Sequence, residues 1–351
     1  MSENQKKVLI TGAAGFIGSH LVEHCAKSGH EVHGLDNLSR KGTSHNLDHL
    51  KSNYSSTFKA HKIDLTNKQN LDIFFLRYGP FDWIAHEAGQ VAVTTSLTDP
   101  LGDFNSNALA TLHLLEATKQ FSPNARFAFA STNKVYGKLL NHQVFEYEDH
   151  YSFDKSFAGI SESQPLDFQS PYGCSKGCAD QYVSDYARSF GLKTAVFRQS
   201  CIYGTRQFGL EDQGWVAWFL IATALKKPIT IYGDGKQVRD LLWIDDLCDL
   251  YLKFWQSKSF AWGTAINAGG GTENCLSIQQ LFKLLQDSGI KSEKLEFSEW
   301  RQGDQKIFSS DNTLAKKLLN WHPKITPQKG ILRLWRWIKE NQSQIEKLLS
   351  K

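Results

Sequence analysis

The sequence predicts an α/β protein, with a doubly wound parallel sheet in its first part and a smaller C-terminal domain. Two observations support this fold class. Strand-like and helix-like segments alternate through about the first two hundred residues, which is typical of a parallel sheet covered by helices on both faces. The glycine-containing segment "TGAAGFIG" (11–18) also lies where the first strand should turn into the first helix. Beyond residue 205 the alternation stops, which indicates the second domain.

The expected elements follow in chain order. Strands are expected at 7–12, 31–36, 58–64, 82–89, 126–131 and 193–200, and helices at 16–27, near 103–120 and from Pro171. Residues 138–170 show no clear period and are long for a connection, so we interpret them as a substrate or lid region. The predicted first domain comprises 1–204 with 239–265 returning to it, and the second comprises 205–238 and 266–351.

Composition excludes several classes of protein. With 351 residues, of which 41% are hydrophobic, the chain can build a full core. Lys and Arg (40) scarcely outnumber Asp and Glu (36), and the charges are scattered, so a nucleic-acid partner is not expected. The polar start carries no apolar stretch for a signal peptide or a membrane span, which favours a cytoplasmic protein without a membrane partner. Six cysteines without paired spacing predict reduced thiols and no metal site.

The glycine segment predicts a Rossmann-type dinucleotide site. Gly12, Gly15 and Gly18 allow the backbone to approach a pyrophosphate, to which the helix N-terminus offers N–H groups. Asp36 lies eighteen residues after Gly18, at the end of the next predicted strand. Its carboxylate there can accept hydrogen bonds from both ribose hydroxyls and repel a 2′-phosphate. This arrangement favours NAD over NADP. Asp64 could reach the adenine amino group, although an N-cap for the following helix explains it equally well.

A second set of residues indicates acid–base chemistry. In "SPYGCSKG" (170–177), Ser170 is a plausible N-cap, and Tyr172 and Lys176 share one helix face four residues apart. A nearby ammonium and the positive nicotinamide ring both favour the phenolate, so the pair can act as a base near neutral pH. Thr132, at the end of a neighbouring strand, can hold the substrate oxygen. The alternative to a catalytic pair is that Tyr172 and Lys176 are ordinary surface residues at helical spacing.

With these residues the chain resembles the extended short-chain dehydrogenase/reductases, the NAD-dependent nucleotide-sugar epimerases and dehydratases, over nearly its whole length. The resemblance implies that Thr132, Tyr172 and Lys176 are catalytic and that Asn107 lies near the cofactor. The expected cofactor-binding residues are Gly12, Gly15, Phe16, Ile17, Gly18, Asp36, Asn37, Asp64, Leu65, Ala88, Gly89, Gln90, Asn107, Tyr172 and Lys176. Arginines of this family hold the substrate diphosphate, and the expected substrate-binding residues are Gln90, Thr132, Asn133, Arg206, Arg239 and Arg301.

The residues after Thr132 discriminate between reactions. Dehydratases resembling this chain have Asp and Glu there, whereas this sequence has Asn133 and Lys134, which do not form an acid and base pair for removing water. Oxidation to an acid generally uses a cysteine nucleophile in related folds, and Cys174 and Cys178 are expected to pack within their helix. Epimerisation is therefore the favoured reaction.

The segments "STNKVYG", "SPYGCSKG", "DQGWVAWF" and "GKQVRD" are most similar to the subfamily of CDP-paratose 2-epimerases, which produce CDP-tyvelose. The resemblance implies that Tyr172 takes the proton of the sugar 2-hydroxyl and that a 2-keto intermediate receives hydride back on its other face. Gly89, where many relatives have Ala, could open space for a differently placed sugar.

Other functions remain open at this point. The same catalytic residues would serve a UDP-hexose 4-epimerase, and a dehydratase or a non-catalytic NAD-sensing protein is less favoured. The predicted helix from Pro171 carries more large apolar side chains than one buried face would hold, namely Tyr182, Val183, Tyr186 and Phe190. This suggests a homodimer or homotetramer, although a helix buried in the core explains these residues nearly as well.

Overall fold

The computed structural model describes residues 5–209, 214–301 and 304–349. The chain divides into two compact units. The first comprises Met1–Val135, Ser170–Arg198 and Cys248–Ile266, and the second comprises Tyr136–Gln169, Gln199–Leu247 and Asn267–Lys351. Compared with the domain limits expected from the sequence, residues 136–169 and 199–204 join the second unit, and the segment returning to the first unit is 248–266 instead of 239–265.

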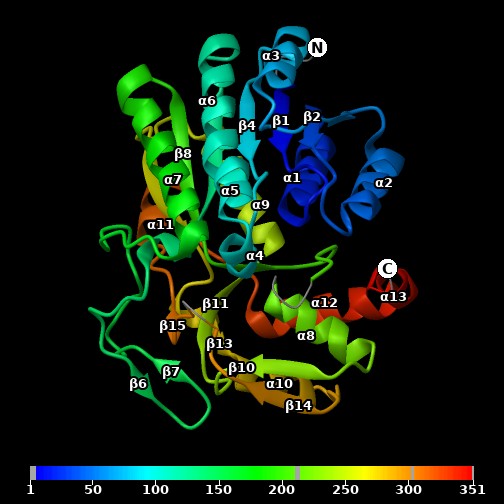
Figure 1. The fold of residues 1–351 in the computed structure, drawn as a ribbon, viewed down its shortest axis with the longest axis vertical. Coiled ribbons are helices and arrows are strands. Elements are labelled where there is room, and N and C mark those ends of the chain that lie inside the picture. Colours follow the sequence, from blue (N-terminus) through cyan, green and yellow to red (C-terminus); the bar gives the residue numbers. More distant parts are fainter. Residues whose placement is uncertain (1–4, 210–213, 302–303, 350–351) are drawn as a thin grey trace. The chain divides into compact units, whose positions relative to one another are not determined.

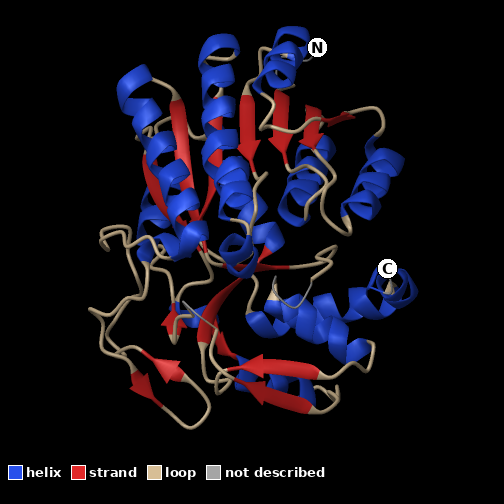
Figure 2. Ribbon diagram, viewed as in Figure 1, coloured by secondary structure: helices blue, strands red, loops and turns tan. Residues whose placement is uncertain are grey.

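The first unit is built on a seven-stranded sheet (Figure 2), which confirms the predicted fold class. Its strands are β1 (Lys7–Thr11), β2 (Glu31–Asp36), β3 (Phe58–Lys62), β4 (Trp83–His86), β5 (Arg126–Thr132), β8 (Lys193–Gln199) and β12 (Thr264–Ala268). Their spatial order is β12-β8-β5-β4-β1-β2-β3. Strand β1 pairs in parallel with β2 on one side and with β4 on the other. The chain order therefore reverses between β1 and β4, where ligands bind in open sheets of this kind.

Helices flank this sheet (Figure 1). They are α1 (Phe16–Lys27), α2 (Thr43–Tyr54), α3 (Lys68–Tyr78), α4 (Val93–Thr98), α5 (Pro100–Phe104), α6 (Ala110–Phe121), α7 (Ser170–Phe190) and α9 (Ile244–Gln256). Helix α1 contacts α2, while α6 contacts both α3 and α7. The helix expected near 103–120 is divided, because a π-helical turn, η1 (Asn105–Leu109), separates α5 from α6.

Apolar strand residues explain the position of the core. In β1, every residue from Val8 to Thr11 is buried, as expected of a central strand covered on both faces. One core cluster includes Leu9 of β1, Ile84 of β4, Phe127 of β5 and Leu114 of α6, each fully buried. The carboxyl ends of these strands are thereby held at one edge of the sheet, where Gly12, Asp36 and Thr132 lie.

The second unit contains shorter elements. They are β6 (Phe145–Glu146), β7 (Tyr151–Ser152), β9 (Cys201–Tyr203), α8 (Trp215–Ala224), β10 (Ile229–Tyr232), β11 (Val238–Trp243), η3 (Thr272–Asn274), β13 (Cys275–Ser277), α10 (Ile278–Asp287), β14 (Leu295–Ser298), β15 (Ile307–Phe308), α11 (Thr313–Leu319), α12 (Pro327–Glu340) and α13 (Gln342–Leu349); the turn η2 (Asn133–Tyr136) joins the units. Strand β11 pairs with β9, β13 and β15. Residues 138–169 are mostly irregular, as expected, with one small β6–β7 ladder.

In the segment "DQGWVAWF" (212–219), residues 215–219 form the start of α8, and residues 212 and 213 lie outside the described residues. No helix in the described ranges is long and apolar enough to cross a bilayer.

A buried ion pair anchors α7 to the sheet. Asp180 is fully buried, and its two carboxylate oxygens accept hydrogen bonds from Nε and Nη2 of Arg198 in β8, both at 3.0 Å. Ser131 of β5 donates a third hydrogen bond to Asp180, at 2.7 Å. The helix is therefore held by charge-assisted contacts to two strands, eight residues after Tyr172.

Replacing Arg198 by Ala should destabilise the first unit strongly, because it leaves Asp180 charged and buried without its partner. Loss of one member of such a pair costs about 3–5 kcal/mol. The matched control is Lys27→Ala, which breaks the exposed Lys27–Glu23 pair of α1 and should cost no more than about 0.5 kcal/mol. Urea unfolding measures both, and similar values for the two variants would contradict the anchoring role.

Candidate functional site

The glycine turn lies against the end of β4. Gly12 has φ +65°, and a Cβ there would lie 2.8 Å from the backbone nitrogen of Ala88. The Thr11 hydroxyl is 2.8 Å from Nδ1 of the buried His86, and it accepts a 3.3 Å hydrogen bond from the nitrogen of Ala88. Two segments that the sequence assigned to the cofactor, 11–18 and 88–90, are therefore brought together at the point where the strand order reverses.

The start of α1 is shaped for an anion. A Cβ on Gly18 would collide with the carbonyl of Gly12, so the helix can begin close to the turn. Gly15 takes an extended conformation as the N-cap and provides no side-chain cap. The first N–H groups of the helix, including those of Phe16 and Ile17, are therefore not satisfied by a capping side chain and suit a pyrophosphate.

Acidic side chains follow β2 and β3. Asp36 accepts hydrogen bonds from the backbone nitrogens of Ala14 (3.0 Å) and Leu38 (2.8 Å), which place its carboxylate beside the glycine turn. Asn37 donates to Asp64 at 3.0 Å. A cavity adjoins Asp36 and is lined by Ala13, Ala14, Gly34, Asp36, Leu38, Leu47, Lys51, Phe58, Ala60, His61 and Lys62.

The alternative reading of Asp64 as a helix cap is wrong. Asn67 is the N-cap of α3 and accepts from the nitrogen of Asn70 at 3.0 Å. Asp64 instead accepts from the backbone and hydroxyl of Thr66 and from Asn37, so it closes the turn after β3, next to the partly exposed end of the sheet. The buried Leu65 follows it. An anion-binding helix start, a carboxylate after β2 and a polar turn after β3 together fit a dinucleotide such as NAD.

Tyr172 and Thr132 meet at the end of β5. Both side chains are buried, and the Thr132 hydroxyl hydrogen-bonds the Tyr172 phenol. Burial raises the pKa of Tyr172 to about 12, the hydrogen bond from Thr132 lowers it, and the charge of Asp103 raises it. The phenol is thus neutral at physiological pH in the protein alone, which differs from the effect expected of a neighbouring ammonium, whereas the sequence expectation of a base joins Lys176 with the positive nicotinamide ring.

The position of Lys176 explains this difference. Its ammonium donates a hydrogen bond to the carbonyl of Ala130 and lies 4.4 Å from the ring centroid of Phe129. Burial lowers the pKa of Lys176 to about 8, whereas Glu87, Asp180 and Asp103 raise it. Lys176 is therefore fixed to β5, and the Tyr172 phenol needs a further positive charge before it ionises.

Gly89 accommodates Asn107. A Cβ at Gly89 would lie 2.7 Å from Oδ1 of Asn107 and 3.9 Å from Nζ of Lys176. That same Oδ1 accepts from the backbone nitrogen of Gln90 at 2.9 Å. Because residue 89 has no side chain, the Asn107 amide can pack against the turn that follows β4. This contact, which lies within the first unit, explains why residue 89 is glycine. The Gln90 side chain is directed to Asp103, at 2.7 Å.

The second unit carries the three expected arginines. Arg239 of β11 donates to Asp304 at 2.8 Å and to the carbonyl of Val238. The Arg301 guanidinium lies 3.9 Å from the ring centroid of Tyr232. Arg206 adopts a left-handed backbone conformation, with φ 58°. Two of the three guanidinium groups are therefore held in place by contacts inside this unit.

Sequence reasoning missed several organising residues. His86 bridges Thr11 and the hydroxyl of Thr111, and burial lowers its pKa to about 3, so it is neutral. In the second unit, buried Asp240 accepts from the nitrogens of Gly271 (3.1 Å) and Ser310 (3.0 Å) and fixes β11 beside Arg239. The available signals were that Asp240 ends the segment "GKQVRD" and that His86 lies two residues before Ala88, the first of the expected cofactor residues after β4.

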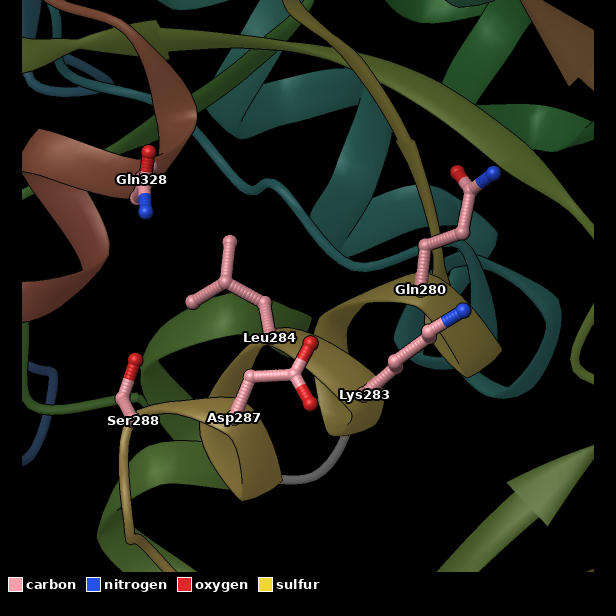
Figure 3. Close-up of a pocket in the computed structure, with 6 residues that line it drawn as sticks. All are labelled: Gln280, Lys283, Leu284, Asp287, Ser288 and Gln328. Atoms are coloured by element: carbon pink, nitrogen blue, oxygen red, sulfur yellow. The ribbon is translucent and has the colours of Figure 1, made fainter.

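A separate groove lies on the second unit (Figure 3). It is formed by α10 and the start of α12, and Leu284 points into it between polar side chains. Its lining residues are Gln280, Lys283, Leu284, Asp287, Ser288 and Gln328, none of which was expected at the site. Within the described residues no group of three His, Cys, Asp or Glu side chains is arranged to hold a metal.

Comparison with known proteins identifies the family. Residues 8–269 match the NAD dependent epimerase/dehydratase family. The chain belongs to this family. The match spans the glycine turn, Thr132, Tyr172 and Lys176, so the sequence resemblance and the expected cofactor, NAD, are confirmed.

The relatives carry related activities. The chain is 43% identical to the CDP-paratose 2-epimerase of Salmonella typhi over 94% of its length and 98% of that protein. It is 33% identical to the UDP-glucuronate 4-epimerase of Thermodesulfobacterium geofontis, covering 97% and 98% of the two chains. The crystal structure of the Bacillus cereus UDP-glucuronic acid 4-epimerase with UDP-glucuronic acid and NAD is similar, with a TM-score of 0.81, 30% identity and coverage of 95% and 99%.

Proposed function

We propose that the protein is an NAD-dependent epimerase that inverts C2 of CDP-paratose to give CDP-tyvelose. The observation that carries the proposal is the buried Tyr172–Thr132 contact at the end of β5, with Lys176 fixed beside it. The choice of substrate is supported by the 43% identity to the Salmonella typhi enzyme. The chain's other relatives at 33% identity and below include 4-epimerases acting on UDP-sugars, which make C4 the alternative position.

Some of these residues transfer the proton, and others bind and orient the substrate. Thr132 holds the sugar 2-hydroxyl oxygen in line with the phenolic oxygen of Tyr172, which takes the proton and later returns it. When bound, NAD supplies a hydride acceptor and donor together with a positive charge near the phenol. Lys176 adds to that charge from its place beside β5. Arg206, Arg239 and Arg301 would bind the diphosphate, for which planar guanidinium groups are suited.

The surroundings of Thr132 disfavour the other reactions of the family. Asn133 is buried, and its side-chain oxygen faces the Thr132 hydroxyl at 3.4 Å, so an amide occupies the place after the catalytic threonine. An amide cannot act as the acid that dehydration needs. Burial raises the pKa of the Cys178 thiol and raises that of Cys201 to about 12. Neither provides the thiolate nucleophile for oxidation to an acid.

Purified protein incubated with CDP-paratose and no added cofactor should convert it to a second sugar with inverted C2. Proton NMR of the H1–H2 coupling measures this conversion, and extraction of the denatured protein measures NAD. Because the hydride returns to the substrate, retained NAD suffices for many turnovers. No conversion by a sample that contains NAD, together with turnover of UDP-glucuronic acid or UDP-glucose, would contradict C2 inversion and support the 4-epimerase.

Tyr172→Phe should remove most activity, by about 10²–10⁴-fold, because the proton at the sugar hydroxyl loses its acceptor. NAD content and thermal unfolding should stay near those of the unsubstituted protein. Tyr182→Phe is the matched control, since Tyr182 lies on the same helix with 43% of its surface exposed. An active Tyr172→Phe protein would exclude the phenol as the base.

The cysteines support a reducing compartment. All six are free, and Cys25 and Cys248 are buried. Unpaired thiols in this number are typical of proteins kept in a reducing environment. A cytoplasmic location is therefore part of the proposal, and it is consistent with nucleotide-sugar substrates.

An apolar surface on the first unit supports self-association. Helices α4 and α5 both contact α7 (Figure 1). The exposed large apolar side chains on these helices are Leu97, Leu101, Phe104, Tyr182 and Phe190, with Leu101 75% and Phe190 52% exposed. In contrast, Val183 and Tyr186 are buried, so α7 has both a core face and an apolar outer face. We infer that two copies of the chain meet on these helices, as a homodimer or within a homotetramer.

The double variant Leu101→Glu and Phe190→Glu should therefore shift the protein to a monomer, because burying two carboxylates in an apolar interface is unfavourable. Light scattering after size-exclusion chromatography measures the mass. Leu76→Glu is the control, since Leu76 is 70% exposed on α3 and lies outside this surface. An unsubstituted protein that is monomeric at micromolar concentration would contradict the interface.

A further inference from the structure

The contact between α5 and α7 encloses a carboxylate that the mechanism above leaves unassigned. Asp103 is 1% exposed, so its oxygens must be satisfied inside the protein. Oδ1 accepts hydrogen bonds from Nε2 of Gln90 at 2.7 Å and from Nδ2 of Asn107 at 3.2 Å. Oδ2 accepts from the hydroxyl of Ser175 at 2.5 Å. A buried carboxylate is thus held by three neutral side chains.

Each of these side chains comes from a different part of the site. Gln90 is the last residue of the segment 88–90, which follows β4. Its Nε2 also donates a hydrogen bond to the carbonyl of Ala92. Asn107 belongs to the π-helical turn and donates a second hydrogen bond, to Ser175 at 3.0 Å. Ser175 lies on α7 between Tyr172 and Lys176. One carboxylate therefore joins the β4 turn, the π-helical turn and the catalytic helix.

We propose that Asp103 is a positioning residue of the reaction: it fixes the α7 turn bearing Tyr172 and Lys176 against the turn after β4, and its buried negative charge acts on both side chains. This inference rests on the proposed epimerase function of the same site. It assigns to α5 a role in the chemistry although none of its side chains belongs to the expected catalytic set.

The charges around Lys176 determine in which direction the pH dependence of activity should shift when the charge of Asp103 is removed. The ionisable groups that act on it are Glu87 from the β4 end, Asp180 from α7 and Asp103 from α5, all of which raise its pKa against the effect of burial. His86 from β4 also lies near Lys176 and is neutral. Asp103 raises the pKa of Tyr172 as well. Removing its charge must therefore lower both pKa values, and the pH range of activity must move toward acid.

Asp103→Asn removes the charge and keeps the size of the side chain. The NAD-containing protein should stay folded, and the ratio of kcat/KM near pH 9 to that near pH 6 should fall roughly threefold or more, since one pKa unit corresponds to a tenfold change in ionised fraction. Asp103→Glu should restore the ratio in part. Ser175→Ala is the matched variant: it breaks the link to α7 and keeps the charge, so kcat should fall about tenfold at unchanged KM without a shifted profile.

A second readout does not depend on turnover. The near-ultraviolet absorbance of tyrosinate, titrated in the NAD-containing protein against Tyr172→Phe, reports ionisation of Tyr172, and Asp103→Asn should lower its midpoint. Superimposable profiles and midpoints would overturn the electrostatic role, and an unchanged kcat in Ser175→Ala would overturn the positioning role even if Asp103→Asn does not fold. If the unsubstituted protein turns over no nucleotide sugar, the epimerase function fails while the titration still decides the role of Asp103.

Discussion

The site depends on how α7 is held against β5. Tyr172 and Lys176 can act together with Thr132 only if a helix and a strand keep a fixed register, because a shift of about 1 Å between reacting groups is costly for catalysis. Three contacts set that register: Lys176 donates to Ala130, Ser131 donates to Asp180, and Thr132 bonds Tyr172. They involve three consecutive residues of β5 and helix residues from Tyr172 to Asp180, so the strand end and the helix are joined over about two helical turns.

Burial has opposite consequences for the pKa values of Tyr172 and Lys176. Desolvation disfavours the phenolate of Tyr172 and the ammonium of Lys176 alike, since both are charged forms. It therefore raises the pKa of the first and lowers that of the second. Carboxylates that act on Lys176 raise its pKa and so counteract its desolvation. The pKa of the Tyr172 phenol is lowered by Thr132, and a bound positive charge would lower it further. A buried tyrosine of this kind is suited to become a base only when the cofactor is present.

The second unit uses a related design for its arginines. Asp240 is fully buried and fixes the backbone around β11, while Asp304 holds the guanidinium of Arg239. A guanidinium has five N–H donors, so a bond to one carboxylate leaves others for an anion. The hydrogen bond to Asp304 restricts the rotamers of Arg239, which lowers the entropy cost of any further contact that the guanidinium makes.

The sequence by itself determined the alternation of strands and helices, the glycine turn with Asp36, and the Tyr172–Lys176 spacing, because each depends on local periodicity or on neighbours a few residues apart. The tertiary structure alone decided which of these side chains act on one another. Gly89 is small because Asn107, eighteen residues away, packs on it, and Asp103 matters because Gln90 and Ser175 converge on it. The pKa of Tyr172 likewise follows from burial, which no local pattern encodes. Such properties arise from contacts between elements distant in the chain, and a single sequence does not reveal them.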